Sequence, residues 1–497
     1  MATRRDQLQS YQYMTQRVLS AFVMRETDPA QSPLRRGIGA VFAGIMVAVL
    51  VGAGFGVYGI LTKVGGTAWK ADGSIVIERE TGATFIFMDG RLHPTLNFTS
   101  ALLASGRGAS QLFRVSQKSL GSVPRGITIG ITGAPDSLPP AAKAVGLPWT
   151  VCSTAGTSSS GGQTATVSLM AGEATAGARA SGNGQGVLIR DVTAGLTYLV
   201  VNGHRHQLWE SRTVIPALFG AVVTPAPVGT AWINALPAGV PISPITINNR
   251  GTDSKIVTGR KIGDLLVVQT GSGPQHYLVF DDGIAPITPL QKNIIDAQFP
   301  GKDPAQVSVG DINKAKRSSR LTTPEGNDAT APSEPPKLDL QPGSPGDLVC
   351  ATTTDPRNAP QITVGGTIPS IDAGVPTIGR STAGTTLADR VSVPAGRVAV
   401  VRVLPSATAT SGAYAIITDM GVRFSVPSAE VLRMLGYSPD KATDVPSSLV
   451  TRIPAGPVLD PAAVFQPQVA GAPAAPSSPP APSTSPSGSP SPKPSAS

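Results

Sequence analysis

Residues 83–103 read ATFIFMDGRLHPTLNFTSALL and decide what kind of fold the chain adopts. The apolar run Phe85-Ile86-Phe87 favours a strand, and Asp89-Gly90 after it is a turn signal between two strands. Thr99-Ser100 is the expected N-cap region of a short helix. Together with an apolar run at 73–78, the stretch predicts a small unit of about three strands and one helix.

The same pattern occurs three more times along the chain, at residues 196–218, 275–295 and 412–435. The turns of these repeats are Asn202-Gly203, Asp282-Gly283 and Asp419-Met420-Gly421. Further strands are expected at 186–189, 265–269 and 398–403, an N-cap at 425–428, and Pro–x–Gly elements lie at 124–126, 237–239 and 454–456. Because each unit is too small to bury a large core alone, we expect the units to pack on one another or on another domain.

The composition excludes several classes of protein. The chain has 497 residues, a formal net charge of +9, 14% charged residues, 55 glycines and 47 prolines. It is too rich in glycine and proline for a helical bundle, and too apolar to be disordered throughout. Its two cysteines are too few for a zinc ribbon or a disulfide-dense scaffold. The basic residues are dispersed rather than clustered with aromatic residues, so no nucleic-acid partner is expected.

Residues 37–62, GIGAVFAGIMVAVLVGAGFGVYGILT, carry no charge and are long enough to cross a bilayer. A cleavable signal peptide is the alternative, but it fits poorly because 36 residues precede the apolar run. The preceding arm is rich in arginine, which predicts a cytoplasmic N-terminus. We therefore expect a single-pass membrane protein with the residues after Lys63 on the outer side.

Small residues recur every fourth position along this segment, at Ala40, Gly44, Ala48, Gly52 and Gly56. Such a stripe predicts close packing against another membrane helix, although glycine is also common in membrane helices that make no such contact. Apolar residues of the cytoplasmic arm recur at near-helical spacing, at Leu8, Tyr11, Val18, Leu19 and Phe22. The arm is expected to be a basic amphipathic helix that binds the membrane surface or a partner, with Pro29 and Pro33 separating it from the span.

Cys152 and Cys350 bracket the second and third repeats. We expect the segments around them to meet in one β-rich central domain from which these two repeats emerge. An oxidising compartment favours a disulfide between the two cysteines, and two buried free thiols are the alternative. In the loop-entropy model such a bridge stabilises the fold by about 5 kcal/mol at most.

The predicted fold class is α+β: a transmembrane helix, then an elongated outer domain of four small repeat modules around a disulfide-braced central domain. The predicted regions are an arm (1–36), the span (37–62), module one (63–126), the first segment of the central domain with a Gly/Ser-rich loop (127–185), module two (186–250), module three (251–316), a Pro-rich linker with the second segment of the central domain (317–402), module four (403–460) and a Pro/Ser/Ala tail (461–497). The tail is expected to be disordered or polyproline-like.

Motifs for catalysis are not recognisable in this sequence. No GxxxxGK[ST] is present, since Gly301-Lys302 precedes Asp303, and residues 130–136 (GITGAPD) are typical of a turn. His204 and His206 lack a third metal ligand at sensible spacing, and His93 and His276 lack a nucleophile partner. We therefore predict no catalytic, cofactor-binding or metal-binding residues, and a membrane-anchored assembly or binding protein.

Eight segments together resemble the EccB family of type VII (ESX) secretion systems. They are 90–94 (GRLHP), 97–101 (NFTSA), 130–136, the pair Trp149 and Cys152, 232–237 (WINALP), 275–285 (QHYLVFDDGIA), 421–427 (GVRFSVP) and 456–459 (GPVL). The resemblance implies a structural core subunit that forms a dimer within a hexameric membrane complex.

The resemblance also implies partners and an alternative activity. The implied partners are an FtsK/SpoIIIE-type motor ATPase, a multi-span channel subunit, a further core subunit and a subtilisin-like protease. The outer modules of the family have been likened to cell-wall-binding modules, which implies peptidoglycan as a further ligand. Family members are sometimes labelled ATPases, so nucleotide hydrolysis, with ATP as cofactor, is the alternative function, although this sequence offers no phosphate-binding loop.

Overall fold

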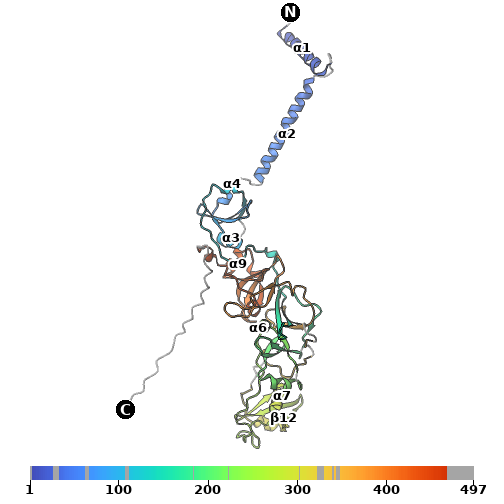
Figure 1. Ribbon diagram of the computed structural model, residues 1–497, viewed down its shortest axis with the longest axis vertical. Helices are drawn as coiled ribbons and strands as arrows, with labels where there is room; N and C mark the ends of the chain where they lie inside the picture. The colour runs from blue at the N-terminus through green and yellow to red at the C-terminus, as the bar shows by residue number, and fades with distance from the viewer. Residues whose placement is uncertain are drawn as a thin grey trace, which may run out of the picture. The chain divides into compact units, whose positions relative to one another are not determined.

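The computed structural model of the chain describes residues 3–25, 33–61, 66–106, 111–182, 184–221, 223–301, 303–321, 329–338, 341–342 and 347–466. The chain divides into two compact units, Met1–Lys70 and Ala71–Ser497 (Figure 1). The first unit is helical, and the second contains the sheets. Each is described by itself.

The first unit contains two helices, α1 (Arg4–Met24) and α2 (Pro33–Leu61). The Thr3 and Asp6 side chains form a capping box that begins α1, with Thr3 Oγ1 donating to Asp6 Oδ2 at 2.7 Å. Pro33 does not stand apart from the apolar helix, as the sequence suggested, but is its first residue. Proline is favoured there because the first helical N–H has no intrahelical acceptor.

Four sheets of the second unit have the same four-stranded arrangement. Sheet 1 contains β1 (Ser74–Glu78), β2 (Thr84–Met88), β3 (Arg91–Pro94) and β4 (Leu112–Val115), with α3 (Phe98–Ser105) and α4 (Gln117–Leu120). Sheet 2 contains β8 (Gly186–Asp191), β9 (Thr197–Val201), β10 (His204–Gln207) and β11 (Ala226–Val228), with α5 (Ser211–Phe219) and α6 (Thr230–Ala235).

Sheet 3 contains β12 (Leu265–Thr270), β13 (Gly273–Val279), β14 (Ile284–Ile287) and β15 (Ala305–Gln306), with α7 (Pro289–Gln298) and α8 (Val309–Lys314). Sheet 4 contains β20 (Val398–Leu404), β21 (Ala413–Thr418), β22 (Arg423–Val426) and β23 (Thr443–Pro446), with α9 (Ala429–Met434) and α10 (Ser447–Val450). In each sheet the first three strands are antiparallel neighbours, and the fourth pairs in parallel with the first.

Each of the four repeats therefore has four strands and two helices, whereas the sequence predicted about three strands and one helix for each repeat. The missed fourth strands are short, from two residues in β15 to four in β4 and β23. Strands this short give no periodic signal in the sequence. The first helix of sheet 1 begins two residues earlier than predicted, because the Asn97 side chain accepts from the Ser100 N–H. The expected N-cap of α9 is confirmed at Ser428.

A seven-stranded central sheet lies between these units in the chain. Its strands are β5 (Trp149–Thr157), β6 (Gln163–Ala171), β7 (Arg179–Ala180), β16 (Leu348–Thr353), β17 (Gln361–Val364), β18 (Val375–Pro376) and β19 (Arg390–Ser392). Their order is β18-β19-β6-β5-β16-β17-β7. The Gly/Ser-rich loop was expected within residues 150–185, but residues 150–171 form most of the long β5–β6 hairpin, because threonine and valine suit a strand.

Two predicted boundaries shift. The strand β20 pairs with β21 and β23, so sheet 4 begins at 398 and not at 403. The predicted tail begins too early, because α11 (Pro461–Val464) is capped by Asp460 and buries Val464 completely. Residues 467–497, to which the expectation of disorder applies, lie outside the described residues.

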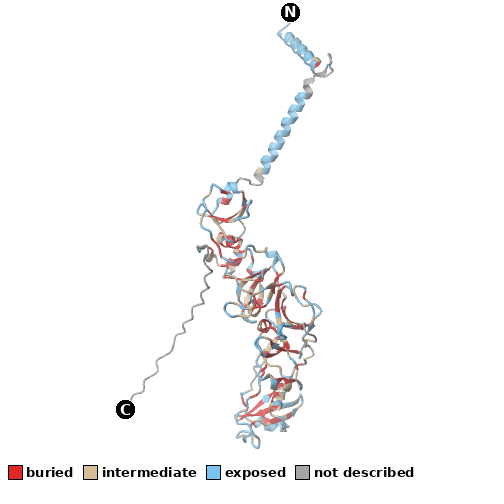
Figure 2. Cartoon of the chain, in the orientation of Figure 1, coloured by how far each residue is buried: buried red, intermediate tan, exposed pale blue. Residues whose placement is uncertain are grey.

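Buried residues run through the sheets (Figure 2), and hydrophobic clusters join one sheet to another. Sheets 1 and 4 share a cluster that includes Ile86 and Ile416. Sheets 2 and 4 share the largest cluster with the central sheet, where Trp232 of α6 donates to the Val151 carbonyl at 3.1 Å. Sheets 2 and 3 share a cluster in which Ile215 of α5 packs with Ile294 of α7. Sheets 2 and 4 thus share one core with the same face of the central sheet, while sheet 1 packs on sheet 4 and sheet 3 packs on sheet 2.

Candidate functional site

The apolar helix α2 presents a complete face of small residues. Residues Gly37–Gly59 have a mean hydropathy of 2.4, and within the described part of the chain only this helix is long and apolar enough to cross a membrane. Ala40, Gly44, Ala48, Gly52 and Gly56 all lie exposed on it. A Cβ atom placed on Gly44, Gly52 or Gly56 would meet no atom within 4 Å. The face is therefore open to another helix.

The helix α1 also exposes its apolar side chains. The residues singled out in the sequence are Leu8 (60% exposed), Tyr11 (71%), Val18 (56%), Leu19 (43%) and Phe22 (86%). Arginine lies close to aromatic residues on the same helix, since the Arg17 guanidinium is 5.5 Å from the centre of the Tyr13 ring. The predicted helix is present, and these side chains are available to a membrane or a partner.

The disulfide joins neighbouring strands of the central sheet. Cys152 of β5 lies directly opposite Cys350 of β16, and the two sulfurs are bonded. Both residues are fully buried with Met170 and Ile368. The two cysteines are 198 residues apart, and sheets 2 and 3 lie in the enclosed loop. The bridge therefore fixes the point from which that long insertion leaves and returns.

The four predicted turns have different surroundings. Asp89-Gly90 and Asn202-Gly203 both have positive φ values, as in a two-residue hairpin turn. A Cβ on Gly90 would meet nothing within 4 Å, whereas a Cβ on Gly203 would lie 2.4 Å from the Pro360 carbonyl oxygen of the central domain. Of these two turns, only that of sheet 2 packs against the central domain.

The other two turns differ in length, since Phe280 pairs with Gly283 around two residues in sheet 3 and Thr418 pairs with Val422 around three in sheet 4. The Asp282-Gly283 turn contains a positive φ only at Gly283, which packs against the Lys316 carbonyl of its own sheet. Asp419 accepts from the Gly396 N–H at 2.7 Å, and Gly421 lies against Val375 and Val391 of the central sheet. The turns of sheets 2 and 4 thus contact the central domain, in agreement with the shared core.

A closing strand extends beyond the third strand in each of the four small sheets. We use this name for residues 124–129 in sheet 1, 237–242 in sheet 2, 316–318 in sheet 3 and 454–456 in sheet 4. The second residue of each pairs in parallel with the third strand, as Leu92–Arg125, Arg205–Ala238, Ile284–Arg317 and Arg423–Ala455. The Pro–x–Gly elements of the sequence are the closing strands of sheets 1, 2 and 4.

In these three sheets an aromatic ring lies directly over the glycine. A Cβ atom would come within 2.3 Å of His93 at Gly126, within 2.3 Å of His206 at Gly239 and within 2.4 Å of Phe424 at Gly456. His206 is buried, and its Nδ1 lies 2.8 Å from the Val240 carbonyl oxygen. Burial lowers the pKa of His206, and the neighbouring His204 adds to this effect. The ring is therefore held neutral, with Nδ1 as the donor.

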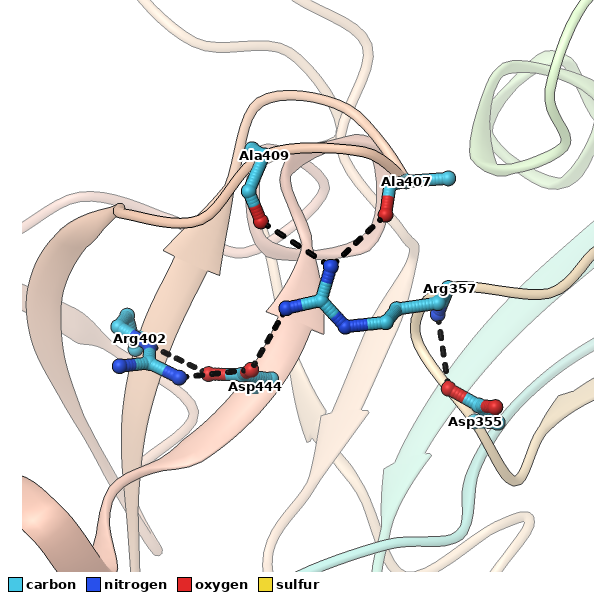
Figure 3. A network of polar contacts seen from close by, with 6 residues as sticks. All are labelled: Asp355, Arg357, Arg402, Ala407, Ala409 and Asp444. Atoms are coloured by element: carbon cyan, nitrogen blue, oxygen red, sulfur yellow. Dashed lines mark hydrogen bonds and ion pairs between the residues drawn. The ribbon is translucent and has the colours of Figure 1, made fainter.

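An ionic network holds the central domain against sheet 4 (Figure 3). Arg402 of β20 donates to Asp444 of β23 through Nε at 2.6 Å and Nη2 at 2.8 Å, and this pairing raises the pKa of Arg402. Arg357, from the loop between β16 and β17, donates to the carbonyls of Ala407 and Ala409 at 3.1 and 3.2 Å. Its Nη2 also lies 3.9 Å from Asp444. The side chains of Arg357 and Arg402 are therefore both held by hydrogen bonds within the fold.

His204 and His206 are neighbours on β10, but the other two histidines lie in different sheets. His93 lies over a glycine of sheet 1, and burial lowers the pKa of His276 of sheet 3, near Lys292. In the described ranges, no group of three or more His, Cys, Asp or Glu side chains is placed to hold a metal ion. The main features of the described residues are thus the exposed faces of α1 and α2, the disulfide and the ionic network.

Comparison with known proteins was made by sequence and by fold. Residues 1–470 match the profile of the family described as type VII secretion system ESX-1, transport TM domain B. This chain belongs to the EccB family. The ESX-2 secretion system ATPase EccB2 of Mycobacterium tuberculosis is 30% identical over 449 residues, covering 84% of this chain and 86% of that protein.

Two solved structures share the EccB fold of this chain. A chain of an intact ESX-5 inner membrane complex is 25% identical with a TM-score of 0.63, covering 96% of this chain and 98% of that one. A chain of the periplasmic assembly of the ESX-5 inner membrane complex is 25% identical with a TM-score of 0.60, covering 82% and 96%. The first likeness includes nearly all of both chains.

Proposed function

We propose that this EccB-family chain is a structural core subunit of a type VII (ESX) secretion machine in the inner membrane. The observation that carries the proposal is the whole-chain match to a chain of an intact ESX-5 inner membrane complex. The fold is consistent with this role, because its exposed faces and internal braces suit assembly with other proteins. In this proposal α1 is cytoplasmic, α2 spans the membrane and the sheets lie in the periplasm.

The outer unit is proposed to consist of four copies of one repeat module around the central sheet. The shared strand order of sheets 1 to 4 and their equivalent closing strands support this count. The Arg357 hydrogen bonds to Ala407 and Ala409 and the docked turns would keep modules two and four at fixed positions on the central sheet, and the disulfide would fix the point from which the insertion emerges.

The partners are proposed from the family resemblance. They are a second copy of this chain within a hexameric complex, the motor ATPase, the multi-span channel subunit, the further core subunit and the subtilisin-like protease. The small-residue face of α2 would pack on membrane helices of these subunits, because glycine and alanine let two helix backbones approach closely. Apolar residues of α1 would contact their cytoplasmic regions or the membrane surface.

The test of assembly through α2 is a double substitution, Gly52→Leu/Gly56→Leu, in the full chain within its complex. We expect most of the intact complex to disappear from native gels, because two leucines hold the partner helix away. Gly39→Leu/Gly54→Leu is the matched control, since both residues lie at least about 120° around the helix from the midpoint of Gly52 and Gly56. Equal loss of the complex in both variants, or in neither, contradicts packing through this face.

Nucleotide hydrolysis is the second candidate function, because relatives such as the Mycobacterium tuberculosis protein carry ATPase in their names. No Walker motif occurs in this sequence. Calorimetry of the full chain with millimolar ATP distinguishes the two functions. Absence of binding heat excludes hydrolysis by this subunit, while saturable binding favours it. A pull-down of the same purified chain with peptidoglycan tests the cell-wall binding that the family resemblance implies.

A further inference from the structure

The outer edge of the closing strand in sheet 2 is covered by another segment of the chain. The Val240 N–H donates to the Ala329 carbonyl at 2.7 Å. Four residues further on, the Ser333 carbonyl accepts from the Leu290 N–H of α7 at 2.9 Å. Ala331, between them, packs on the cluster that contains Ile242. Residues 329–335, which we call the strap, thus run from the closing strand of sheet 2 to α7.

Sheet 1 has the same edge without a strap. Ile127 is the counterpart of Val240, because His93 Nδ1 contacts the Ile127 carbonyl at 3.1 Å as His206 Nδ1 contacts that of Val240. No residue in the described ranges accepts a hydrogen bond from the Ile127 N–H. The Ile127 side chain is 59% exposed, and Leu96, which donates its N–H to Ile129, is 42% exposed. An open strand edge flanked by apolar side chains is a site for strand addition.

The described chain ends beside this edge. Gly130, three residues after Ile127, donates its N–H to the Val464 carbonyl at 2.9 Å. Val464 belongs to α11, which packs on α3 in the core that contains Ile129. Ile127 lies about 10 Å along the strand from Gly130 at about 3.3 Å per residue. Four residues beyond Gln466 reach about 13 Å, so the following segment can span the distance.

The sequence after this point repeats the pattern of the strap. Residues 329–335 read ATAPSEP and residues 470–476 read AGAPAAP, so both match A-x-A-P-x-x-P. Alanine gives small side chains that fit between larger apolar neighbours. Proline favours an extended backbone in itself and in the residue before it, which lowers the entropy lost on docking.

We propose that residues 470–476 of the chain's own tail dock on the open edge of sheet 1, as residues 329–335 dock on sheet 2. A backbone carbonyl of the tail accepts from the Ile127 N–H, and alanine side chains lie against Leu96 and Ile127. Tethering a few residues away gives the tail an effective concentration in the millimolar range, so even weak docking suffices for occupancy. The tail then protects an edge that would otherwise pair with foreign strands.

Hydrogen exchange of the full chain in detergent tests the proposal, read by mass spectrometry on the peptide 124–128. Three variants are compared with the parent: truncation after Gln466, Ala470→Asp/Ala472→Asp, and the equally charged control Ser485→Asp/Ser487→Asp. We expect exchange to become about tenfold faster in the first two and to stay unchanged in the control, because only the docked segment protects Ile127.

The Val240 amide serves as the folding control, since its acceptor Ala329 is unaffected by the tail. Its exchange is expected to be the same in all four proteins. Equal exchange of peptide 124–128 in the parent and the truncated chain overturns the proposal. Protection that increases with protein concentration also overturns it, because the occupant is then the tail of a second copy.

Discussion

Sheets 2 and 3 are consecutive in the chain and pack on each other through α5 and α7, yet their closing strands are built in opposite ways. In sheet 2 the large His206 ring lies over Gly239, where a Cβ would come within 2.3 Å of the ring. In sheet 3 the same two positions hold Ala285 and Ser318, which are both buried. In sheet 3 the small residue, Ala285, thus lies on the third strand, β14, and the larger one, Ser318, lies on the closing strand.

The combined volume of the two facing residues is therefore constrained, whereas the volume of either residue alone is not. Sheets 1 and 4 follow sheet 2, with His93 over Gly126 and Phe424 over Gly456. Interiors are packed at crystal-like density, so the combined volume of two facing residues is limited. This explains why the Pro–x–Gly element appears in three repeats and is replaced by Lys316-Arg317-Ser318 in the fourth.

The largest expected effect comes from adding one methyl group to the sheet 2 pair. Gly239→Ala places a Cβ against the buried His206 ring, which cannot move without losing its hydrogen bond to Val240. We expect the free energy of local unfolding of β9 and β10, measured by hydrogen exchange, to fall by about 3 kcal/mol. Ser318→Ala in sheet 3 is the matched control and is expected to change local stability far less. Similar losses in both variants would contradict the volume argument.

A smaller effect is expected from restoring the volume balance. His206→Ala/Gly239→Ala gives sheet 2 an alanine on the strand, as Ala285 does in sheet 3. We expect the double variant to be more stable than the sum of the single changes predicts, by about 2 kcal/mol, because residues in contact couple. The measurement is a double-mutant cycle on the same exchange readout. Additive losses would show that the ring and the glycine do not constrain each other.

The sequence predicts much of this architecture, and its failures have physical causes. The three antiparallel strands of each sheet are correctly predicted, because their apolar runs and turn residues are local signals. The fourth strands are not, since β15 holds two residues and forms only through pairing with β12. Pairing of Cys152 with Cys350 follows from their positions around the insertion. The ring-over-glycine contact is not predictable from one repeat, because its two residues are 33 positions apart in sheets 1 and 2.

The third prediction concerns pH and separates sheet 2 from sheet 4. Burial lowers the pKa of His206 below its ordinary value of 6.5, so the unfolded chain binds a proton more readily than the folded chain. The stability of sheet 2 should therefore fall as pH decreases below about 6.5, and level off once pH passes the lowered pKa. His206→Phe copies the Phe424 ring of sheet 4 and should remove this dependence. Exchange of β9 amides between pH 7 and pH 5 provides the measurement, and an unchanged slope in the variant would assign the dependence to other groups.

The smallest expected effect concerns the position of an arginine, which also differs between the four sheets. Arginine stands on the closing strand in sheets 1 and 3, as Arg125 and Arg317, but on the third strand in sheets 2 and 4. Arg125 lies 4.3 Å from the centre of the Phe85 ring, and Arg317 lies 5.1 Å from that of Tyr277. Because a cation–π contact made by an exposed arginine contributes about 0.5–1 kcal/mol, Arg125→Ala should lower the local stability of sheet 1 by that amount.

Arg125→Lys is the informative control for this change, since lysine keeps the charge but loses the flat guanidinium that stacks on the ring. We expect it to recover only a fraction of the loss, as measured by exchange of the β2 amides. Full recovery would mean that charge alone matters at this position. No loss in either variant would mean that the closing strand of sheet 1 is held by its backbone pairing with Leu92, and that the placement of arginine in the four sheets reflects the neighbouring residue's size alone.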